Sequence, residues 1–184
     1  MPHRGFTLIE LLAVLALAAL LVTFALPGAQ RLIHEVSAET AIHAVRGGLA
    51  FARAAAATHN RPVLLCPLDA DDQCRGDWRD GFAVFVDITG RAERHPEAPV
   101  IRQFPPLAEG ASLRFAAFGT GRYLRMLPTG QTAWQNGRFE YCPPAGSGAR
   151  PRVMVVNVQG RGRIVRPETI DPKRRSGVHR AVPC

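Results

Sequence analysis

The sequence lacks the residue patterns on which most enzymes and metal centres depend. None of its four cysteines stands in a Cys-x-x-Cys pair, no serine or cysteine lies in a strand–turn–helix elbow, and no glycine loop opens a helix around a phosphate. The acidic loop 69–77 lacks the regular Asp-x-Asp-x-Asp-Gly spacing of a calcium site, so we interpret it as a solvated turn. We therefore expect no catalytic residue, no metal and no cofactor, and we do not expect an enzyme.

Charge is almost missing from the beginning of the chain. Between Phe6 and Leu26 there are 21 residues, of which only Glu10 is charged. A helix of that length extends about 30 Å, enough to cross the hydrocarbon core of a bilayer. A carboxylate inside such a span costs on the order of 2.5–3.5 kcal/mol, so Glu10 needs a positive partner. Cleavage after Gly5 would create one, the α-amino group of Phe6.

Two other interpretations of this segment stay open: an ordinary signal anchor and a cleaved secretory signal. A secretory signal carries its charges ahead of a shorter apolar core and has a small-x-small cleavage site after it, without an internal glutamate. Arg4 is the one firm positive charge ahead of the apolar run, and it favours a cytoplasmic N-terminus.

The hexapeptide Gly5–Glu10 resembles the processing site of type IV pilins and type II secretion pseudopilins. The resemblance implies that a prepilin peptidase cuts after Gly5 and methylates Phe6, and that Glu10 pairs with the terminal amine of a neighbouring subunit during filament assembly. The protein would cross the inner membrane once. Its partners would be other pilin subunits and the pilus assembly machinery, and the assembled domain would lie on the extracellular pilus. The implied division is a leader at 1–5, a transmembrane and filament-core helix at 6–28, and a periplasmic globular domain at 29–184.

The helix is expected to continue past the membrane and to become amphipathic. We expect Pro27-Gly28 to interrupt it, because proline removes a backbone hydrogen bond and glycine loosens the turn. We interpret Gly47-Gly48 as a site of close packing rather than a hinge, and Asn60-Arg61-Pro62 as the end of the helix. Between these points an apolar stripe should pack against a sheet: Leu32, Val36, Ile42, Val45, Leu49 and Ala52.

The remainder of the chain alternates short apolar runs with turns, which predicts strands, and no repeat or Gly/Ser linker divides it. The fold class is therefore α+β, with one long N-terminal helix packed on a largely antiparallel sheet, as in pilins. The last two strands should form a hairpin across a glycine turn at 159–162. The expected strands are 63–66, 81–87, 100–104, 112–115, 137–142, 153–158 and 163–166.

The body of the chain resembles one branch of the pilin family. Cys66-Pro67, Cys74 and the run Trp78–Asp87 are similar to the GspH/FimT-type domain, which includes a secretion pseudopilin and a minor pilin of type IVa pili. Together with the hexapeptide and a Gly-Arg-x-Arg sequence, the resemblance extends from Gly5 to about Arg166.

The four cysteines allow three disulfide pairings, and an even number beyond a membrane anchor fits an oxidising compartment. We favour Cys66–Cys74 with Cys142–Cys184, which by chain entropy would contribute roughly 2.5 and 4 kcal/mol. The second bridge would hold the C-terminal tail against the sheet. A zinc site is the alternative, although the cysteines lack both the pair spacing and a nearby histidine.

Lysine occurs once, and the excess of basic residues is concentrated at the C-terminus. Residues 160–184 hold seven basic and two acidic side chains, a net charge of +5 out of +8 for the whole chain. On the turn Gly160-Arg161-Gly162-Arg163, glycine allows a phosphate backbone to approach two guanidinium groups closely. Such a surface suits phosphate contact without the reading of bases. Further cations follow at Arg166, Lys173, Arg174, Arg175 and Arg180.

Within the GspH/FimT family, a Gly-Arg-x-Arg motif near the C-terminus of minor pilins of the FimT type is associated with DNA binding during natural transformation. The resemblance therefore implies a minor type IV pilin that binds extracellular DNA through its phosphates. Two alternatives are a GspH-like minor pseudopilin of a type II secretion system and an assembly-priming minor pilin without DNA binding. In either case the basic tail would be a soluble charged tail or would contact acidic neighbours in the filament.

Overall fold

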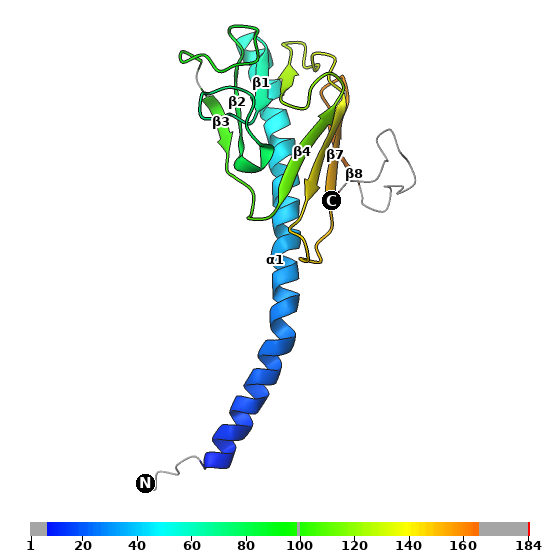
Figure 1. The fold of residues 1–184 in the computed structure, drawn as a ribbon. Helices are drawn as coiled ribbons and strands as arrows, with labels where there is room; N and C mark the ends of the chain where they lie inside the picture. Colours follow the sequence, from blue (N-terminus) through cyan, green and yellow to red (C-terminus); the bar gives the residue numbers. More distant parts are fainter. Residues whose placement is uncertain (1–6, 99, 166–183) are drawn as a thin grey trace.

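The computed structural model describes residues 7–98, 100–165 and 184; inside the helix, the side chains of residues 22 and 24–27 are not among those described. In this part of the chain one long helix is followed by a short 3₁₀ turn and eight strands (Figure 1). The elements are α1 (Leu8–His59), β1 (Val63–Cys66), η1 (Trp78–Asp80), β2 (Phe82–Val86), β3 (Val100–Phe104), β4 (Ser112–Ala117), β5 (Leu124–Met126), β6 (Gly137–Cys142), β7 (Arg152–Val156) and β8 (Gly162–Val165).

Helix α1 has 52 residues and is therefore about 78 Å long. It begins after Thr7, whose hydroxyl accepts a hydrogen bond from the backbone N–H of Glu10. It ends at Asn60, which takes the left-handed conformation with φ of 48°. The predicted end of the helix is therefore confirmed. The predicted interruption at Pro27-Gly28 is wrong, because α1 is one continuous helix across these residues. Proline removes only one backbone hydrogen bond, and the helical turns on both sides remain. In Figure 1 the helix bends gently and does not break.

The first half of α1 projects beyond the strands (Figure 1), and its large apolar side chains from Leu8 to Leu21, as far as they are described, are exposed. Among the described residues, no helix holds an apolar stretch long enough to cross a membrane. Leu32 and Val36 are also exposed, so the predicted stripe is wrong at these two positions. The reason is geometric, since burial of the helix against the strands begins only at Ala38.

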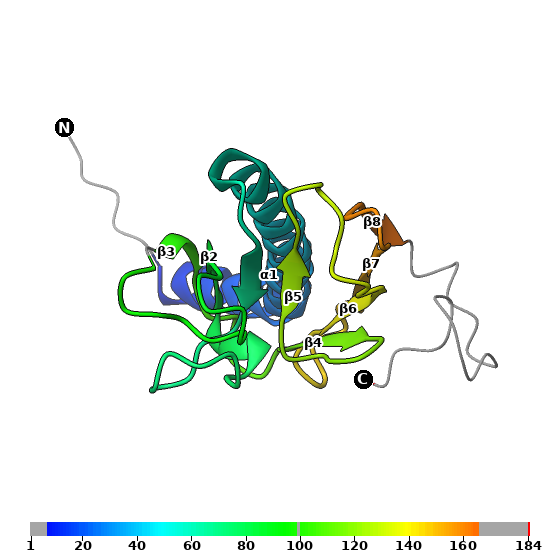
Figure 2. The same ribbon diagram turned by 90° about the horizontal axis from the view of Figure 1, so that it is seen from above.

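Two antiparallel sheets, rather than the single sheet expected, pack around one side of the second half of α1 (Figure 2). The first has the order β3-β2-β1-β5 and the second the order β4-β6-β7-β8. The sequence pattern did not predict strand β5, which pairs with β1 at the edge of the first sheet. Strand β4 pairs with β6 and belongs to the second sheet. The predicted hairpin of β7 and β8 is confirmed, with Val153 opposite Val165.

The remaining residues of the predicted stripe, Ile42, Val45, Leu49 and Ala52, are buried under the two sheets. Gly48 lies on the same side of the helix, where a Cβ atom would come within 3.0 Å of Cε2 of Phe82. Its neighbour Gly47 has open space, with nothing within 4 Å of such an atom. Gly48 therefore allows the close packing expected of the glycine pair.

An aromatic cluster joins the two sheets. The ring of Trp78 lies 5.8 Å from that of Phe82 in the first sheet and 5.0 Å from that of Phe139 in the second, measured between ring centroids. The indole N–H donates a hydrogen bond of 3.0 Å to the carbonyl of Gly121. Because its ring packs against both sheets and its N–H is hydrogen-bonded, Trp78 fixes the position of one sheet relative to the other.

Helix α1 is also attached to β7 by a pair of carboxylates. The guanidinium of Arg152 lies 2.7 Å from the carboxylate of Glu35 and 3.0 Å from that of Glu39, one turn later in the helix. The hydrogen bond from Arg152 holds the pKa of Glu39 below its ordinary value. This contact fixes the helix against the second sheet, near the point where α1 leaves the domain.

Candidate nucleic-acid interface

The predicted Gly-Arg-x-Arg motif lies on the hairpin between β7 and β8, at the edge of the second sheet. The amide of Arg161 donates to Oδ1 of Asn157 at 2.9 Å, and the amide of Asn157 donates to the carbonyl of Arg161 at 3.1 Å. Gly160 has φ of 70°, and a Cβ atom there would come within 2.3 Å of the carbonyl oxygen of Gly130. The turn therefore requires glycine, and it presents the motif on a rigid backbone.

Arg161, directly before β8, and Arg163, in β8, are both exposed and are separated by one residue. The intervening Gly162 and the following Ile164 face the core, where the Cβ position of Gly162 is 2.8 Å from Leu49. Within the described residues neither guanidinium group makes an ion pair. Both are therefore available to an anionic ligand.

Both predicted disulfides are present, Cys66–Cys74 in the first sheet and its following loop, and Cys142–Cys184 from β6 to the last residue of the chain. The zinc alternative is wrong, because all four thiols are joined in these bridges. Since β8 ends at Val165 and Cys184 is bonded to β6, both ends of the intervening tail are attached to the second sheet. The other predicted basic residues lie outside the described residues: Arg166, Lys173, Arg174, Arg175 and Arg180.

The predicted processing site is described only in part. Gly5 and Phe6 lie outside the described residues, whereas Glu10 lies in the first turn of α1 and is exposed. Its pairing with the terminal amine of another subunit stays a prediction.

A second basic surface was missed from the sequence. It includes Arg91 and Arg122, which are exposed, together with the aromatic side chains of Phe118 and Trp134. These residues come from three separate loops, and none of them belongs to a local motif. Only the pairing of β1 with both β2 and β5 brings the loops together.

Two family models match the chain. Residues 41–160 match the type II transport protein GspH, and residues 1–26 match the prokaryotic N-terminal methylation motif. The chain belongs to the GspH family. No curated protein sequence matches it.

Solved structures of minor pilins and of a minor pseudopilin are similar to this chain. The type IV minor pilin FimU of Pseudomonas aeruginosa PAO1, in two crystal forms, gives TM-scores of 0.54 and 0.53 at 18% and 16% identity, covering 70% of this chain and 88% and 92% of FimU. The minor pseudopilin EpsH of the Vibrio cholerae type 2 secretion system gives a TM-score of 0.52 at 13% identity, covering 71% of this chain and 98% of EpsH.

At these identities the solved structures show the fold, and the fold is that of minor type IV pilins and pseudopilins. The predicted pilin-like α+β class is therefore confirmed. Minor pilins and pseudopilins are structural proteins that associate with other subunits in pili or pseudopili.

Proposed function

We propose that this GspH-family protein is a minor type IV pilin that binds extracellular DNA for uptake in natural transformation, like minor pilins of the FimT type. The observation that carries the proposal is the pair Arg161 and Arg163, both exposed and without an ion pair in the described part of the chain. The net charge of +5 over residues 160–184 supports it. The Cys142–Cys184 bridge attaches the last residue of the chain to β6, in the sheet that carries the hairpin.

The chemistry of the hairpin suits phosphates better than bases. Alternate residues of a strand are about 7 Å apart, so two guanidinium groups can contact one phosphate backbone side by side. Each guanidinium can donate two parallel hydrogen bonds to a phosphate. Phosphate contacts carry no sequence information, so binding should not depend on base sequence.

The test is a gel-shift titration of the full chain, kept soluble in detergent, at two salt concentrations. Arg161→Gln with Arg163→Gln should weaken binding and make the dependence of log K on log salt shallower by about 1.8, since each neutralised phosphate contributes roughly 0.9. The melting temperature should hardly change, because exposed arginines contribute little to folding. DNA molecules of different sequence and equal length should bind alike, and neutralising Lys173, Arg174 and Arg175 should have a smaller effect.

Two results contradict this proposal in different ways. If the double variant binds DNA like the parent, the hairpin is not the site. If the parent does not bind DNA at all, the basic surface serves the filament instead.

We also propose that the chain is cleaved after Gly5, methylated on Phe6 and anchored in the inner membrane by residues 6–28, with its globular domain in the periplasm before assembly. The match of residues 1–26 to the N-terminal methylation motif supports this. Glu10 would then pair with the new amine of a neighbouring subunit. Mass spectrometry of protein from its own host should find an N-methylated Phe6, whereas an intact Met1 or a cut after the apolar run contradicts the processing step.

A second candidate function is a minor pseudopilin of a type II secretion system, favoured by the GspH family model and the likeness to EpsH. In that case Arg161 and Arg163 would contact acidic side chains of neighbouring subunits. Neutralising both arginines would then lower incorporation into the filament, while the parent would show no affinity for DNA.

A further inference from the structure

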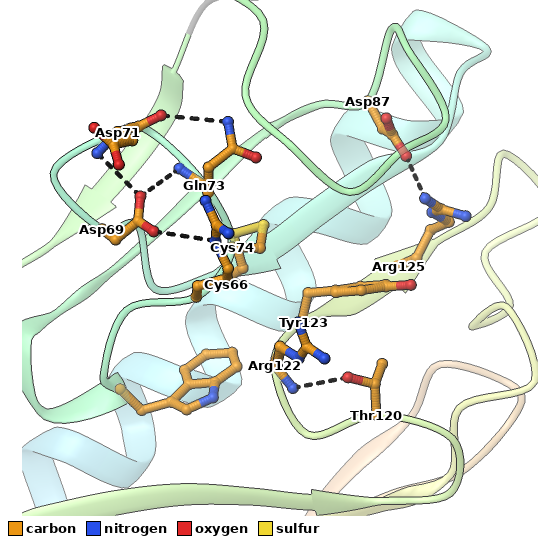
Figure 3. The surroundings of a disulfide bond; sticks show 12 residues. Cys66, Asp69, Asp71, Gln73, Cys74, Asp87, Thr120, Arg122, Tyr123 and Arg125 are labelled. Carbon is orange, nitrogen blue, oxygen red and sulfur yellow. Dashed lines mark hydrogen bonds and ion pairs between the residues drawn. A yellow bond between two sulfur atoms is a disulfide. The ribbon is translucent and has the colours of Figure 1, made fainter.

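Two adjoining hollows lie on either side of the connection between β4 and β5. The first lies between this connection and the loops after β1 and β2, and the second lies between it and the connection from β5 to β6. The first has a volume of about 370 Å³ and the second of about 360 Å³. Thr120 and Tyr123 line both, so the hollows form one continuous surface. Figure 3 shows the residues around the first hollow, with Thr120, Arg122 and Tyr123 near the Cys66–Cys74 disulfide that holds the loop after β1.

The first hollow is positively charged. Three arginines line it, Arg75, Arg91 and Arg122, and all three are exposed. Arg75 lies 3.4 Å from the carboxylate of Asp69, a residue of its own loop. Arg91 and Arg122 make no ion pair among the described residues. The hollow therefore offers two uncompensated guanidinium groups to an anion.

The second hollow is aromatic. The side chains of Phe118 and Trp134 are 76% and 80% exposed, although they lie on loops with fixed backbones. Gln135, which is buried, accepts the amide of Arg125 at 2.6 Å and donates to the carbonyl of Tyr123 at 2.8 Å. Trp134 itself has φ of 61°, a conformation that a large side chain adopts only when its surroundings hold it. The fold thus keeps an indole ring facing solvent on a rigid loop.

Arg125, the fourth arginine of this surface, has a different role. Its guanidinium lies 2.8 Å from the buried carboxylate of Asp87 (Figure 3). It donates a hydrogen bond to the carbonyl of Gly90. It also lies over the ring of Tyr123 at 5.5 Å. Arg125 therefore fixes the strand and ring between the two hollows and adds no free charge.

We propose that the two hollows bind single-stranded nucleic acid, with phosphates on Arg91 and Arg122 and bases stacked on Trp134 and Phe118. Cations beside exposed ring faces are the elements of sequence-tolerant single-strand sites. A duplex offers the same phosphates, but its bases are already stacked on one another. The choice of nucleic acid as ligand rests on the proposed function, to which this surface adds a second site and a preference for single strands.

The test uses the full chain in detergent, a thymidine oligonucleotide and a duplex of the same length. The chain has two tryptophans, of which Trp78 is buried, so quenching of tryptophan fluorescence reports on Trp134. The single strand should quench this fluorescence more than the duplex does. Trp134→Ala should lower affinity for the single strand about 5- to 100-fold and leave duplex affinity unchanged. Phe118→Ala, on a different loop, should show the same selective loss.

Two double variants serve as matched controls, because each removes two positive charges from an exposed position. Arg91→Gln with Arg122→Gln should weaken single-strand binding more than duplex binding. Arg161→Gln with Arg163→Gln should weaken both forms to a similar degree. If the loss of positive charge acted only by weakening the general attraction between the protein and DNA, both double variants would lower the single-strand and duplex affinities equally.

The outcomes separate this inference from the proposed function. If Trp134→Ala and Phe118→Ala bind single strands like the parent while the Arg161 and Arg163 variant is weakened, the inference is wrong and the hairpin site stands. If only the variants of the two hollows are weakened, the inference stands and the hairpin site is wrong. If the parent binds polyglutamate but neither form of DNA, both ideas fail and the surface contacts an acidic protein.

Discussion

The two adjacent glycines of α1 offer a direct test of how the helix packs. Gly47→Ala places a methyl group in open space, where it should stabilise the protein by about 1 kcal/mol because alanine favours the helical conformation. Gly48→Ala brings the same gain in helix propensity. It also brings a Cβ atom within 3.0 Å of Phe82, 3.1 Å of Leu65 and 3.3 Å of Phe104.

The neighbours of Gly48 have little room to move. The rings of Phe82 and Phe104 are stacked with centroids 4.4 Å apart, and Phe82 also contacts Trp78. Overpacking of this kind costs about 1–3 kcal/mol, which offsets or exceeds the gain in propensity. Gly48→Ala should therefore be neutral to about 2 kcal/mol destabilising, and the two variants should differ by about 1–3 kcal/mol.

Thermal unfolding of the full chain in detergent, followed by circular dichroism, measures this difference. For a domain of this size 1 kcal/mol corresponds to about 2–4 °C, so the melting temperatures should lie roughly 5 °C apart, with Gly47→Ala the higher. Each glycine is the control for the other, since the helix and the chemical change are the same. Equal stabilisation by both substitutions would refute the close approach of α1 to the first sheet.

Two further predictions concern the second sheet. Arg152→Met should lower the urea midpoint of unfolding at pH 7. Because Arg152 lowers the pKa of Glu39, this stabilisation is present above the ordinary pKa of 4.5 and is lost as the pH falls through the folded value. The difference in unfolding free energy between parent and variant should therefore shrink in acid by less than about 1 kcal/mol, and a difference that does not change with pH would contradict the pairing. Cys142→Ser with Cys184→Ser opens a bridge that joins residues 42 apart and should cost up to roughly 4 kcal/mol, and an unchanged melting temperature would contradict a constraining role.

Much of the fold was predictable because its signals are local. The helix end at Asn60, the seven longer strands and the β7–β8 hairpin each follow from periodicity or turn residues within a few positions. Strand β5 was missed because Leu124–Met126 is too short to show alternation, and it becomes a strand only through its pairing with β1. Without β5, the division of the strands into two sheets could not be inferred.

The two exposed residues of the predicted stripe show a different limit of sequence-based prediction. Leu32 and Val36 have the spacing of core residues, yet the first residue of α1 that the sheets bury fully is Ala38. Periodicity reports which residues share one side of a helix, whereas their burial depends on how far the sheets extend along it. In a filament subunit, an apolar stripe that continues beyond its own domain is available to other subunits.

The two basic surfaces differ in how far each could be predicted from the sequence. Arg161 and Arg163 are separated by one residue on a glycine turn, so a local motif was enough to single them out. Arg91, Arg122 and Trp134 come from three loops, and an isolated arginine or tryptophan in a loop carries no information about ligands. Their significance arises from tertiary structure, because hydrogen bonds of the buried Gln135 and the Cys66–Cys74 bridge hold the walls of the two hollows. A site of this kind needs rigid loops before its charges and rings can act on the same ligand, and the described contacts supply that rigidity.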